Sequence, residues 1–303
     1  MKYKTTPAQL NFRRSPKVTA GNIMAALPQG QTVEKTADAG NGWWLVKTLL
    51  GGTSQEGYVA SAYLERLEEP AVTAAPATGP AHALPPVHLK EGDASVKRSN
   101  TRRAFPLGEP GMPRRNPADP EAEKSAALGQ IIRYLDVEKS ARYAPDTRST
   151  YCNIYAYDYA YLGGAYIPRV WWTSKAIVDL RAGKSVAAQY GATVSELNAN
   201  SLYNWLEDYG AEFGWKRVFD AHEIQEAANG GGIGIICAIR KNLNEPGHIC
   251  AVVPETATYT AVRTAGKVGV PLQSQAGRTN KKYFSQNWWT SANFRQSGFW
   301  IHD

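Results

Sequence analysis

Cysteine is scarce in this sequence, which contains three cysteines among 303 residues, none of them spaced as Cys-x-x-Cys. Three thiols cannot form a fully paired disulfide framework, and their spacing does not suit a structural zinc site. The chain has no apolar run near the roughly 18–20 residues that a transmembrane helix needs. It also contains no phosphate-binding Gly-x-x-x-x-Gly-Lys-Ser/Thr loop and no dinucleotide-binding fingerprint. We therefore expect a protein without disulfides, metal, cofactor or membrane span.

Basic and aromatic residues are abundant in a sequence whose overall composition is typical of globular proteins. With 43% hydrophobic and 20% charged residues, the chain can bury a core, which excludes a wholly disordered or fibrous protein. Lysine and arginine total 34 against 27 aspartates and glutamates, a formal charge of +7. This charge suits an anionic partner such as a nucleic acid, a lipid head group or an acidic cell-wall polymer. The 9 tryptophans and 16 tyrosines indicate binding surfaces as well as core.

The first residues, MKYKTTPAQLNFRR, are basic, but no apolar segment follows them. An ordinary secretory signal peptide needs such a segment. We therefore expect a product made in the cytoplasm. Any action outside it would need a specialised secretion route or cell lysis.

Residues 1–68 alternate apolar and polar side chains in short runs that Gly and Asn separate. This pattern predicts about five short strands without a helix, and such a density of strands favours a small closed barrel. The region resembles the bacterial Src-homology-3-type (SH3) domain at four motifs, residues 10–13, 27–30, 42–46 and 57–64. The resemblance implies a module that binds cell-wall peptides or targets an attached catalytic domain. Because neighbouring strand residues point to opposite faces, one of Trp43 and Trp44 should be exposed, and Trp43 is the candidate binding residue.

Residues 69–120 change in character, since ten of the 18 prolines fall between residues 67 and 120. Proline fixes φ and removes a backbone donor, so this composition predicts an extended, semi-rigid spacer rather than a packed core. The basic residues between Lys97 and Arg115 are expected to be solvated, the alternative being attachment to an anionic polymer. His82 and His88 are expected to be ordinary linker residues.

Residues 121–303 show helical patterns first and strand patterns afterwards. Helices are predicted within residues 117–140, 154–164, 195–215 and 221–231, and strands within 232–240, 247–254, 268–277 and 297–303. This order is typical of an α+β domain with helices packed on one antiparallel sheet. The sequence thus predicts an all-β barrel at 1–68, a Pro-rich basic linker at 69–120 and an α+β domain at 121–303.

Cys152 differs from the other two cysteines in its surroundings. Cys237 and Cys250 are embedded in apolar strand patterns and are expected to be core residues. Cys152 follows a polar, turn-prone stretch and opens a predicted helix. At a helix N-terminus the macrodipole and free N–H groups lower the pKa of a thiol, and the same N–H groups can stabilise an oxyanion beside the sulfur. Cys152 is therefore the candidate nucleophile.

His248 is the candidate general base. It starts a predicted strand after Gly247, which is expected to leave room for close approach to the ring. If this strand pairs antiparallel with residues 268–277, Gln275 falls near His248, and its amide oxygen can hold the imidazole in one tautomer. The alternative is a structural strand histidine whose hydrogen bonds are satisfied within the fold.

The order of these residues resembles that of the papain-like cell-wall hydrolases, the CHAP and NlpC types. The resemblance covers about residues 120–303 and rests on residues 150–153, 247–253 and 273–277. It implies Cys152 as nucleophile, His248 as general base and Gln275 as orienting residue. In CHAP domains the third position is often acidic, whereas glutamine cannot stabilise an imidazolium by its charge. Glu255 and Asn280 therefore stay open as alternatives.

Paired tryptophans are candidates for lining a groove that binds sugars or peptide. The pairs are residues 171–172 and 288–289, and core filling is an equal alternative for each member. Trp171, Trp172 and Tyr151 are taken as candidate substrate-binding residues. His248 and Cys250 share one strand face, but no further ligands at suitable spacing accompany them, so no metal site is expected.

Together these patterns predict a peptidoglycan hydrolase that cleaves an amide bond in the peptide stem. It would act as a phage lytic enzyme or as a secreted antibacterial effector, and the second role implies a cognate immunity protein. Nucleic acid is not expected as a partner. Two alternatives remain. One is a papain-like toxin that acts on a protein as protease, deamidase or acyltransferase, and the other is a catalytically inactive wall-binding adaptor.

Overall fold

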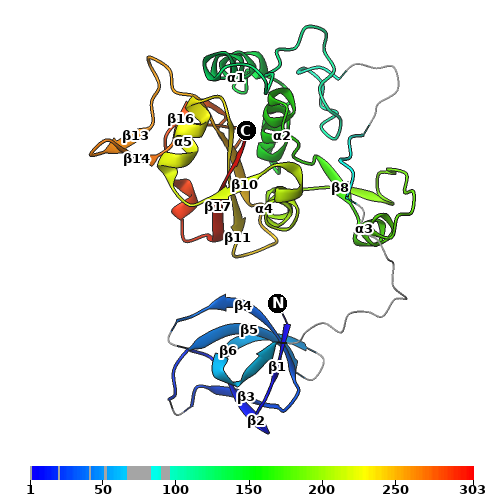
Figure 1. The fold of residues 1–303 in the computed structure, drawn as a ribbon, viewed down its shortest axis with the longest axis vertical. Coiled ribbons are helices and arrows are strands. Elements are labelled where there is room, and N and C mark those ends of the chain that lie inside the picture. The colour runs from blue at the N-terminus through cyan, green and yellow to red at the C-terminus, as the bar shows by residue number, and fades with distance from the viewer. Residues whose placement is uncertain (1, 20, 41, 51–52, 67–82, 90–95) are drawn as a thin grey trace. The chain divides into compact units, whose positions relative to one another are not determined.

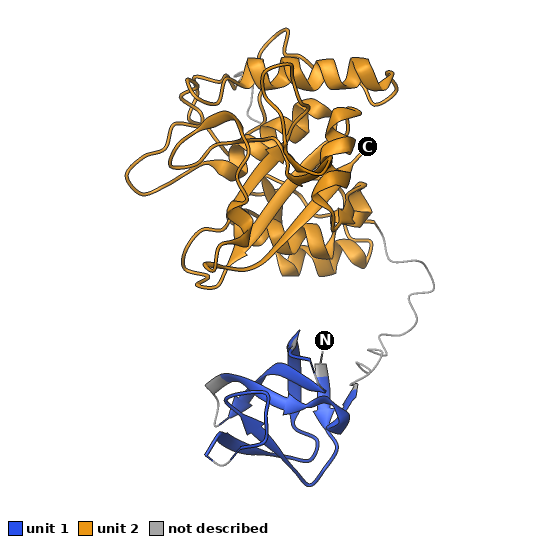
Figure 2. Ribbon diagram, turned by 90° about the vertical axis from the view of Figure 1, so that its left-hand side faces the viewer, with its two compact units in different colours: residues 1–79 blue, residues 80–303 orange. Residues whose placement is uncertain are grey.

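The computed structural model describes residues 2–19, 21–40, 42–50, 53–66, 83–89 and 96–303 (Figure 1). The chain divides into two compact units, residues 1–79 and residues 80–303 (Figure 2). Together they give a mixed α and β architecture, as the sequence predicts. In the described part of the chain, no helix has the length and apolar character needed to cross a membrane.

The first unit is a seven-stranded antiparallel sheet with the order β3-β2-β6-β5-β4-β1-β7. Its strands are β1 (Lys2–Thr5), β2 (Gln9–Arg13), β3 (Ile23–Pro28), β4 (Thr32–Asp38), β5 (Trp43–Leu50), β6 (Thr53–Ala60) and β7 (Leu64–Arg66), with the 3-10 turn η1 (Ser61–Tyr63) before the last. Figure 1 shows the sheet curling on itself. The structure has more strands than the sequence pattern predicted, because residues 22–38 form two strands joined by a turn.

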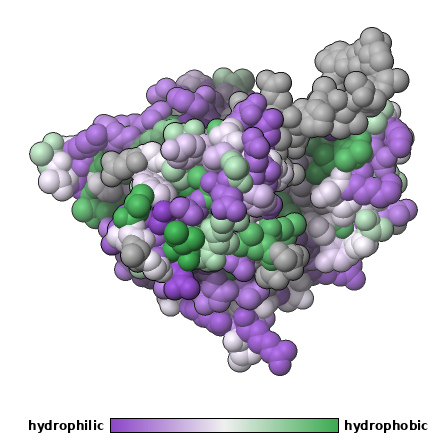
Figure 3. Space-filling view, turned by 90° about the horizontal axis from the view of Figure 1, so that it is seen from below, coloured by the Kyte–Doolittle hydropathy of each residue, from purple (hydrophilic) through white to green (hydrophobic). Residues whose placement is uncertain are grey.

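The core of the first unit is small and apolar. It consists of Leu10, Phe12, Leu27, Val33, Val46 and Val59. A Cβ at Gly57 would lie 2.7 Å from Cζ of Phe12, so this strand position has no room for a side chain. Trp44 packs against this core, and Lys35 lies over its ring at 3.9 Å. On the face seen in Figure 3, apolar groups in green lie among hydrophilic groups in purple.

The second unit is built on a six-stranded antiparallel sheet with the order β10-β17-β11-β12-β15-β16. Its strands are β10 (Lys216–Val218), β11 (Ile233–Arg240), β12 (His248–Val252), β15 (Gln273–Gln275), β16 (Lys281–Phe284) and β17 (Phe294–His302). Two small sheets pair β8 (Val170–Trp172) with β9 (Val194–Glu196), and β13 (Val262–Thr264) with β14 (Lys267–Val270).

Helices cover both faces of the six-stranded sheet. The helices of this unit are α1 (Glu121–Leu135), α2 (Cys152–Gly163), α3 (Ser174–Arg181), α4 (Ala199–Asp208) and α5 (Ala221–Asn229), with 3-10 turns η2 (Gly210–Phe213) and η3 (Trp288–Thr290). Helix α3 lies beside β8 rather than on this sheet (Figure 1). Successive residues of a strand point to opposite faces. Ile235 and Ile249 accordingly join the large core with α1, α2 and α4, whereas Ile236 and Cys250 join a smaller core with α5.

Helix α2 is the central helix of this unit. Ten of its 12 residues are buried, which explains why its tyrosine-rich sequence shows little amphipathic period. The helix ends where the glycine pair predicts, because Gly164 takes a φ of 83° that ends an α-helix without strain in glycine. Cys152 at the other end of α2 is thereby placed against the sheet, where α2 packs on β12.

The predicted linker extends too far along the chain. The structure places four of its apolar residues in the core of the second unit: Leu84, Val87, Val96 and Leu107. His88 also belongs to this unit, since its Nδ1 lies 3.1 Å from the Tyr157 hydroxyl. The prediction of an extended spacer relied on proline content. A proline-rich segment can nevertheless pack against a domain through scattered apolar side chains without forming regular secondary structure. Residues 67–82, His82 among them, and residues 90–95 lie outside the described residues.

Several arginines of this segment are structural rather than solvated. Arg115 is 3% exposed and donates hydrogen bonds to the carbonyls of Gly163 and Gly231. Arg98 pairs with Glu109. A solvated basic segment is therefore the wrong description of Arg98 and Arg115. Their guanidinium groups bind groups brought near only by the tertiary fold, which the charge pattern does not reveal.

Candidate active site

Cys152 is the first residue of α2, and its side chain is almost fully buried, with 4% exposure. The backbone N–H groups of Ile249, Asn153 and Cys152 itself act on its sulfur in the direction that favours the thiolate. Ile249 follows His248 on β12, so the sulfur lies against the main chain directly beside the candidate base. The N–H of Cys152 also lies where it can stabilise an oxyanion that forms next to the sulfur.

The expectation of a lowered thiol pKa at Cys152 is wrong for this structure. Burial raises the pKa of the Cys152 thiol, and the three N–H groups oppose that effect without overcoming it. The physical reason is that a thiolate loses more by leaving water than it gains from the helix terminus. The resting thiol is consequently protonated at neutral pH, and a base must remove its proton when it attacks.

His248 and Gln275 are in direct contact. The Nε2 atom of His248 lies 2.6 Å from Oε1 of Gln275. An amide oxygen only accepts hydrogen bonds, so Nε2 carries the ring proton and Nδ1 keeps its lone pair. The Gln275 amide nitrogen donates to the Thr279 carbonyl at 3.3 Å, which sets the orientation of the amide. The contact arises because β12 pairs antiparallel with β15, as expected, with Ala251 opposite Ser274.

Burial makes His248 a weakly basic, neutral imidazole. Its ring packs edge-on against Trp288 at a centroid distance of 4.5 Å. Burial lowers the pKa of His248 to about 4, while the hydrogen bond with Gln275 acts in the opposite direction. The sulfur of Cys152 and the imidazole are not hydrogen-bonded to each other in this structure. At pH 7 the site therefore holds a neutral thiol and a neutral imidazole whose free Nδ1 can accept a proton.

The two alternatives for the orienting residue are engaged elsewhere. The carboxylate of Glu255 binds Arg263, and this contact holds the pKa of Glu255 at about 2. Asn280 donates to the carbonyls of Val137 and Tyr143, so it ties a loop to the sheet. Of the three residues considered from the sequence, Gln275 is the one in contact with His248.

Gly247 has a different role from the one predicted. A Cβ at this position would lie 2.4 Å from the carbonyl oxygen of Ala238 and 2.6 Å from Oδ1 of Asn200. The glycine therefore lets the main chain before β12 pack closely against β11 and α4, and this packing fixes where His248 begins its strand. The lack of a side chain at Gly247 therefore allows close packing of the backbone and is not needed to make room for the imidazole ring.

Two pockets flank the segment that leads into α2. The first, here called the His248 pocket, has a volume of about 650 Å³ and is lined by His248, Gln275 and Trp288 together with Arg148, Arg240 and Arg278. The second, the Tyr151 pocket, has a volume of about 430 Å³ and is lined by Tyr151, Asn153, Arg103, Arg169 and Glu196. Ser149 and Thr150 line both pockets. Cys152 comes two residues after Thr150 but itself lines neither pocket.

Tyr151 lines a pocket, but its hydroxyl is already used within the fold. It donates a hydrogen bond to Oδ2 of Asp146 at 2.5 Å. The guanidinium of Arg103 lies 3.5 Å from the centre of its ring. These two contacts hold the residue before Cys152 in place, so Tyr151 offers a fixed apolar wall to the pocket.

The prediction that Trp171 and Trp172 bind substrate is wrong. They are 5% and 6% exposed and line neither pocket. Trp171 packs edge-on against Trp205 at 5.5 Å, and the indole N–H of Trp172 donates to the Pro85 carbonyl. Both belong to a three-residue strand enclosed by other segments, so the core-filling alternative holds. Trp288 of the second tryptophan pair lies in the site, where its N–H donates to Gln273 at 2.8 Å.

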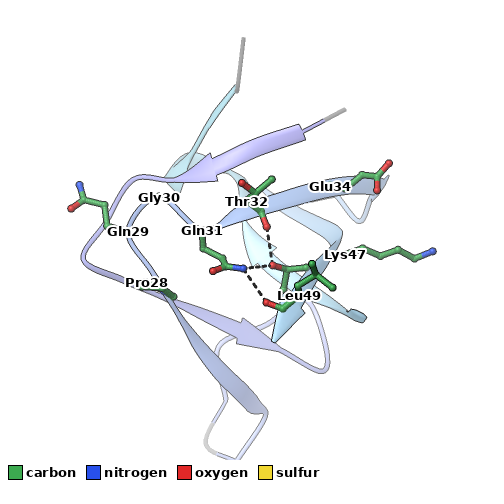
Figure 4. Close-up of a pocket in the computed structure, with 9 residues that line it drawn as sticks. Pro28, Gln29, Gly30, Gln31, Thr32, Glu34, Lys47 and Leu49 are labelled. Atoms are coloured by element: carbon green, nitrogen blue, oxygen red, sulfur yellow. Dashed lines mark hydrogen bonds between the residues drawn. The ribbon is translucent and has the colours of Figure 1, made fainter. Parts of the chain in front are cut away.

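Two of the surface hollows lie in the described part of the first unit. Trp43 is half-buried and lines one of them with Pro7, Leu10 and Tyr63. The other is shown in Figure 4, where the Gln31 amide donates to Thr48 and to the Leu49 carbonyl. The polar groups at the centre of this second hollow are therefore paired with one another. A role for Trp43 in ligand binding stays a prediction.

The remaining cysteines form part of the core. Cys237 and Cys250 are both fully buried, as the sequence predicts, and neither is in a disulfide. Across the described ranges, no three His, Cys, Asp or Glu side chains are grouped so that they could hold a metal ion.

Comparisons with known proteins give little further information. No family model matches the sequence, and no curated protein matches it. Among solved structures, the chain is similar to NlpC2 from Trichomonas vaginalis, with 10% sequence identity, coverage of 99% of this chain and 71% of that chain, and a TM-score of 0.27. A TM-score this low supports no inference about activity, so the functional interpretation depends on the geometry of the site.

Proposed function

We propose that this protein is a peptidoglycan hydrolase that cleaves an amide bond in the peptide stem. In this proposal Cys152 is the nucleophile, His248 is the general base and Gln275 positions the imidazole. One observation carries the proposal: the contact of His248 Nε2 with Gln275 Oε1, on a strand whose next residue, Ile249, has a backbone N–H that favours the Cys152 thiolate. The contact leaves Nδ1 as the atom that can take the thiol proton.

The reaction would follow from the protonation states of the site. Nδ1 of His248 takes the thiol proton as the Cys152 sulfur attacks the amide carbon, and the N–H of Cys152 stabilises the resulting oxyanion. The imidazolium then gives its proton to the leaving nitrogen as the carbon–nitrogen bond breaks, which leaves a thioester on Cys152. A water molecule loses a proton to His248 and attacks the thioester, which releases the acid and restores the thiol.

The choice of peptidoglycan as substrate has two supports. The formal charge of +7 suits an anionic polymer. Residues 1–68 resemble SH3-type domains that bind cell-wall peptides, and the order of the site residues resembles that of papain-like cell-wall hydrolases. In this proposal the protein acts at the cell wall or in the periplasm, either as a phage lytic enzyme or as a secreted antibacterial effector with a cognate immunity protein.

The proposal is tested on purified sacculi. Sacculi are incubated with wild-type protein and with Cys152→Ala, and the released fragments are identified by mass spectrometry. We expect new muropeptide ends with the wild type and none with Cys152→Ala, while circular dichroism shows both proteins folded. Intact sacculi that still co-sediment with the wild type would instead indicate an adaptor. Cleavage or modification of a protein substrate alone would indicate a toxin.

A further inference from the structure

His248 identifies which half of a substrate enters which pocket. A general acid must reach the leaving nitrogen, and the ring of His248 lines the His248 pocket but not the Tyr151 pocket. Under the proposed function, the half of the substrate that departs as an amine therefore occupies the His248 pocket. The half that stays attached to Cys152 then extends away from the His248 pocket.

The charged residues that line the His248 pocket are all positive. Arg148 precedes α2, Arg240 ends β11 and Arg278 follows β15, so three separate segments each contribute an arginine. No Asp or Glu lines this pocket. Because His248 and Gln275 are neutral at pH 7, the catalytic residues add no negative charge that would offset the arginines.

The arginines are not neutralised by nearby acids. Arg148 is exposed, and its guanidinium has no hydrogen bond or ion pair within the described residues. Arg278 uses one guanidinium nitrogen on the carbonyl of Asp146. The Asp146 carboxylate itself is occupied by the Tyr151 hydroxyl and by two backbone N–H groups. Glu245 approaches Arg240 at 3.9 Å, but its side chain is 56% exposed, so this pair is weak.

The Tyr151 pocket is different, although it also contains arginines. Arg169 pairs with Glu196, and Arg103 donates to the Arg142 carbonyl while it stacks on Tyr151. Glu196 thus brings a carboxylate into this pocket beside Arg169, whereas no acid lines the His248 pocket. The asymmetry between the pockets is therefore one of net charge, because three arginines line each pocket but only the Tyr151 pocket includes a lining acid, Glu196.

We infer that the His248 pocket binds a free carboxylate on the leaving half of the substrate, with Arg148 and Arg278 as its main contacts and Arg240 in support. The inference deepens the proposed function and rests on it, since it names the substrate class of the same site: peptides in which the released amine product carries a free carboxylate. The planar guanidinium group presents paired N–H donors that match the two oxygens of a carboxylate.

Binding to an inactive protein tests this inference separately from catalysis. Synthetic stem peptides are prepared in pairs that differ only by a free carboxylate or a carboxamide on the leaving half. Their affinities for Cys152→Ala are measured by isothermal titration calorimetry at low and high salt. We expect tighter binding of the carboxylate form, with a difference that shrinks as salt screens the contact. Replacing Arg148 by Gln in this background should weaken binding of the carboxylate form by about threefold to fivefold and leave the carboxamide form unchanged.

A matched control is Arg133→Gln in the same Cys152→Ala background. Arg133 is an exposed arginine on α1 that lines neither pocket, so this change removes one positive charge away from the site. It should leave the affinities for both peptides unchanged. Equal affinity for the two peptides, or equal weakening of both by Arg148→Gln, would overturn the inference. Failure of the wild type to cleave either peptide or sacculi would instead overturn the proposed function, because the binding preference does not depend on turnover.

Discussion

The His248 pocket and the Tyr151 pocket share Ser149 and Thr150 but use their polar groups in opposite ways. In the Tyr151 pocket the Tyr151 hydroxyl binds Asp146, and Arg169 binds Glu196. In the His248 pocket one imidazole nitrogen remains available, and so does the guanidinium of Arg148. The comparison indicates that polar groups with hydrogen-bond partners inside the protein fix the conformation of the segment before Cys152. Polar groups without such partners face the His248 pocket, where they are available for proton transfer and for binding a ligand.

Removing His248 should have the largest effect on activity. His248→Ala leaves no group to take the Cys152 proton, so kcat should fall by about 10²–10⁴. The matched control is His222→Ala on α5, whose side chain is 42% exposed and lines neither pocket. Release of muropeptides is measured for both. Activity of His248→Ala near the control value would place the base elsewhere.

Removing Asp158 should affect stability rather than catalysis. Asp158 and Arg142 form an ion pair in which both side chains are fully buried. Arg142 also donates to the carbonyls of Arg102 and Phe105, two residues that line the Tyr151 pocket. Asp158→Ala leaves a buried guanidinium without its counter-ion and should lower the free energy of unfolding by about 3–5 kcal/mol.

Thermal unfolding of Asp158→Ala is compared with that of Asp179→Ala. Asp179 pairs with Lys175 and Lys184 at the protein surface, so its loss should change the melting temperature little. An equal melting temperature for the two variants would show that the buried pair stabilises the fold no more than the surface pairs do.

The sequence indicated the residues of the candidate site better than it indicated their environment. Cys152 at a helix start and His248 at a strand start follow from local patterns, and antiparallel pairing brings Gln275 to the imidazole. Burial depends instead on segments far apart in the chain. The raised pKa of Cys152 and the interior position of Trp171 could not be predicted from local patterns.

The docked part of the proline-rich segment was missed for the same reason. Val87 receives a hydrogen bond from the Tyr166 hydroxyl and donates one to it through its backbone, across 79 residues of sequence. The spacing of prolines in the sequence gives no indication of this contact between Val87 and Tyr166. Trp288 could have been found, because the sequence already marked its pair as groove-lining candidates and it follows soon after Gln275.

Gln275→Ala should have an intermediate effect. The substitution removes the acceptor that holds the His248 ring, so the imidazole can rotate and take the other tautomer. We expect kcat to fall by about tenfold or more, with little change in KM, because positioning rather than binding is lost. Circular dichroism and steady-state kinetics on a stem peptide measure the fold and the two constants. Full activity in this variant would remove Gln275 from the mechanism and reopen Glu255 and Asn280.

The pH dependence should show a smaller but diagnostic effect. The pKa of His248 is lowered to about 4 from an ordinary 6.5, so the imidazole stays neutral and able to accept a proton down to about pH 4. The acid limb of kcat/KM should therefore lie near that value. Gln275→Glu places a carboxylate against the ring, stabilises the imidazolium and should move the limb to higher pH. A wild-type limb near pH 6.5, or no movement in the variant, would contradict this assignment.

Stability follows the same titration. The unfolded chain takes up a proton at His248 near its ordinary pKa of 6.5, whereas the folded protein resists protonation until about pH 4. The contribution of the neutral histidine is thus fully present above pH 6.5 and is lost as the pH falls toward 4. Equilibrium unfolding across this range should be less pH-dependent in His248→Ala than in the wild type.

The most direct measurement is to trap the acyl intermediate. Wild-type protein is mixed with a stem peptide, quenched in acid during turnover and digested, and each cysteine-containing peptide is weighed by mass spectrometry. We predict a thioester adduct on Cys152 and none on Cys237 or Cys250, with the adduct absent in His248→Ala. Undiminished product formation by Cys152→Ala, with no adduct on any cysteine of the wild type, would contradict the account.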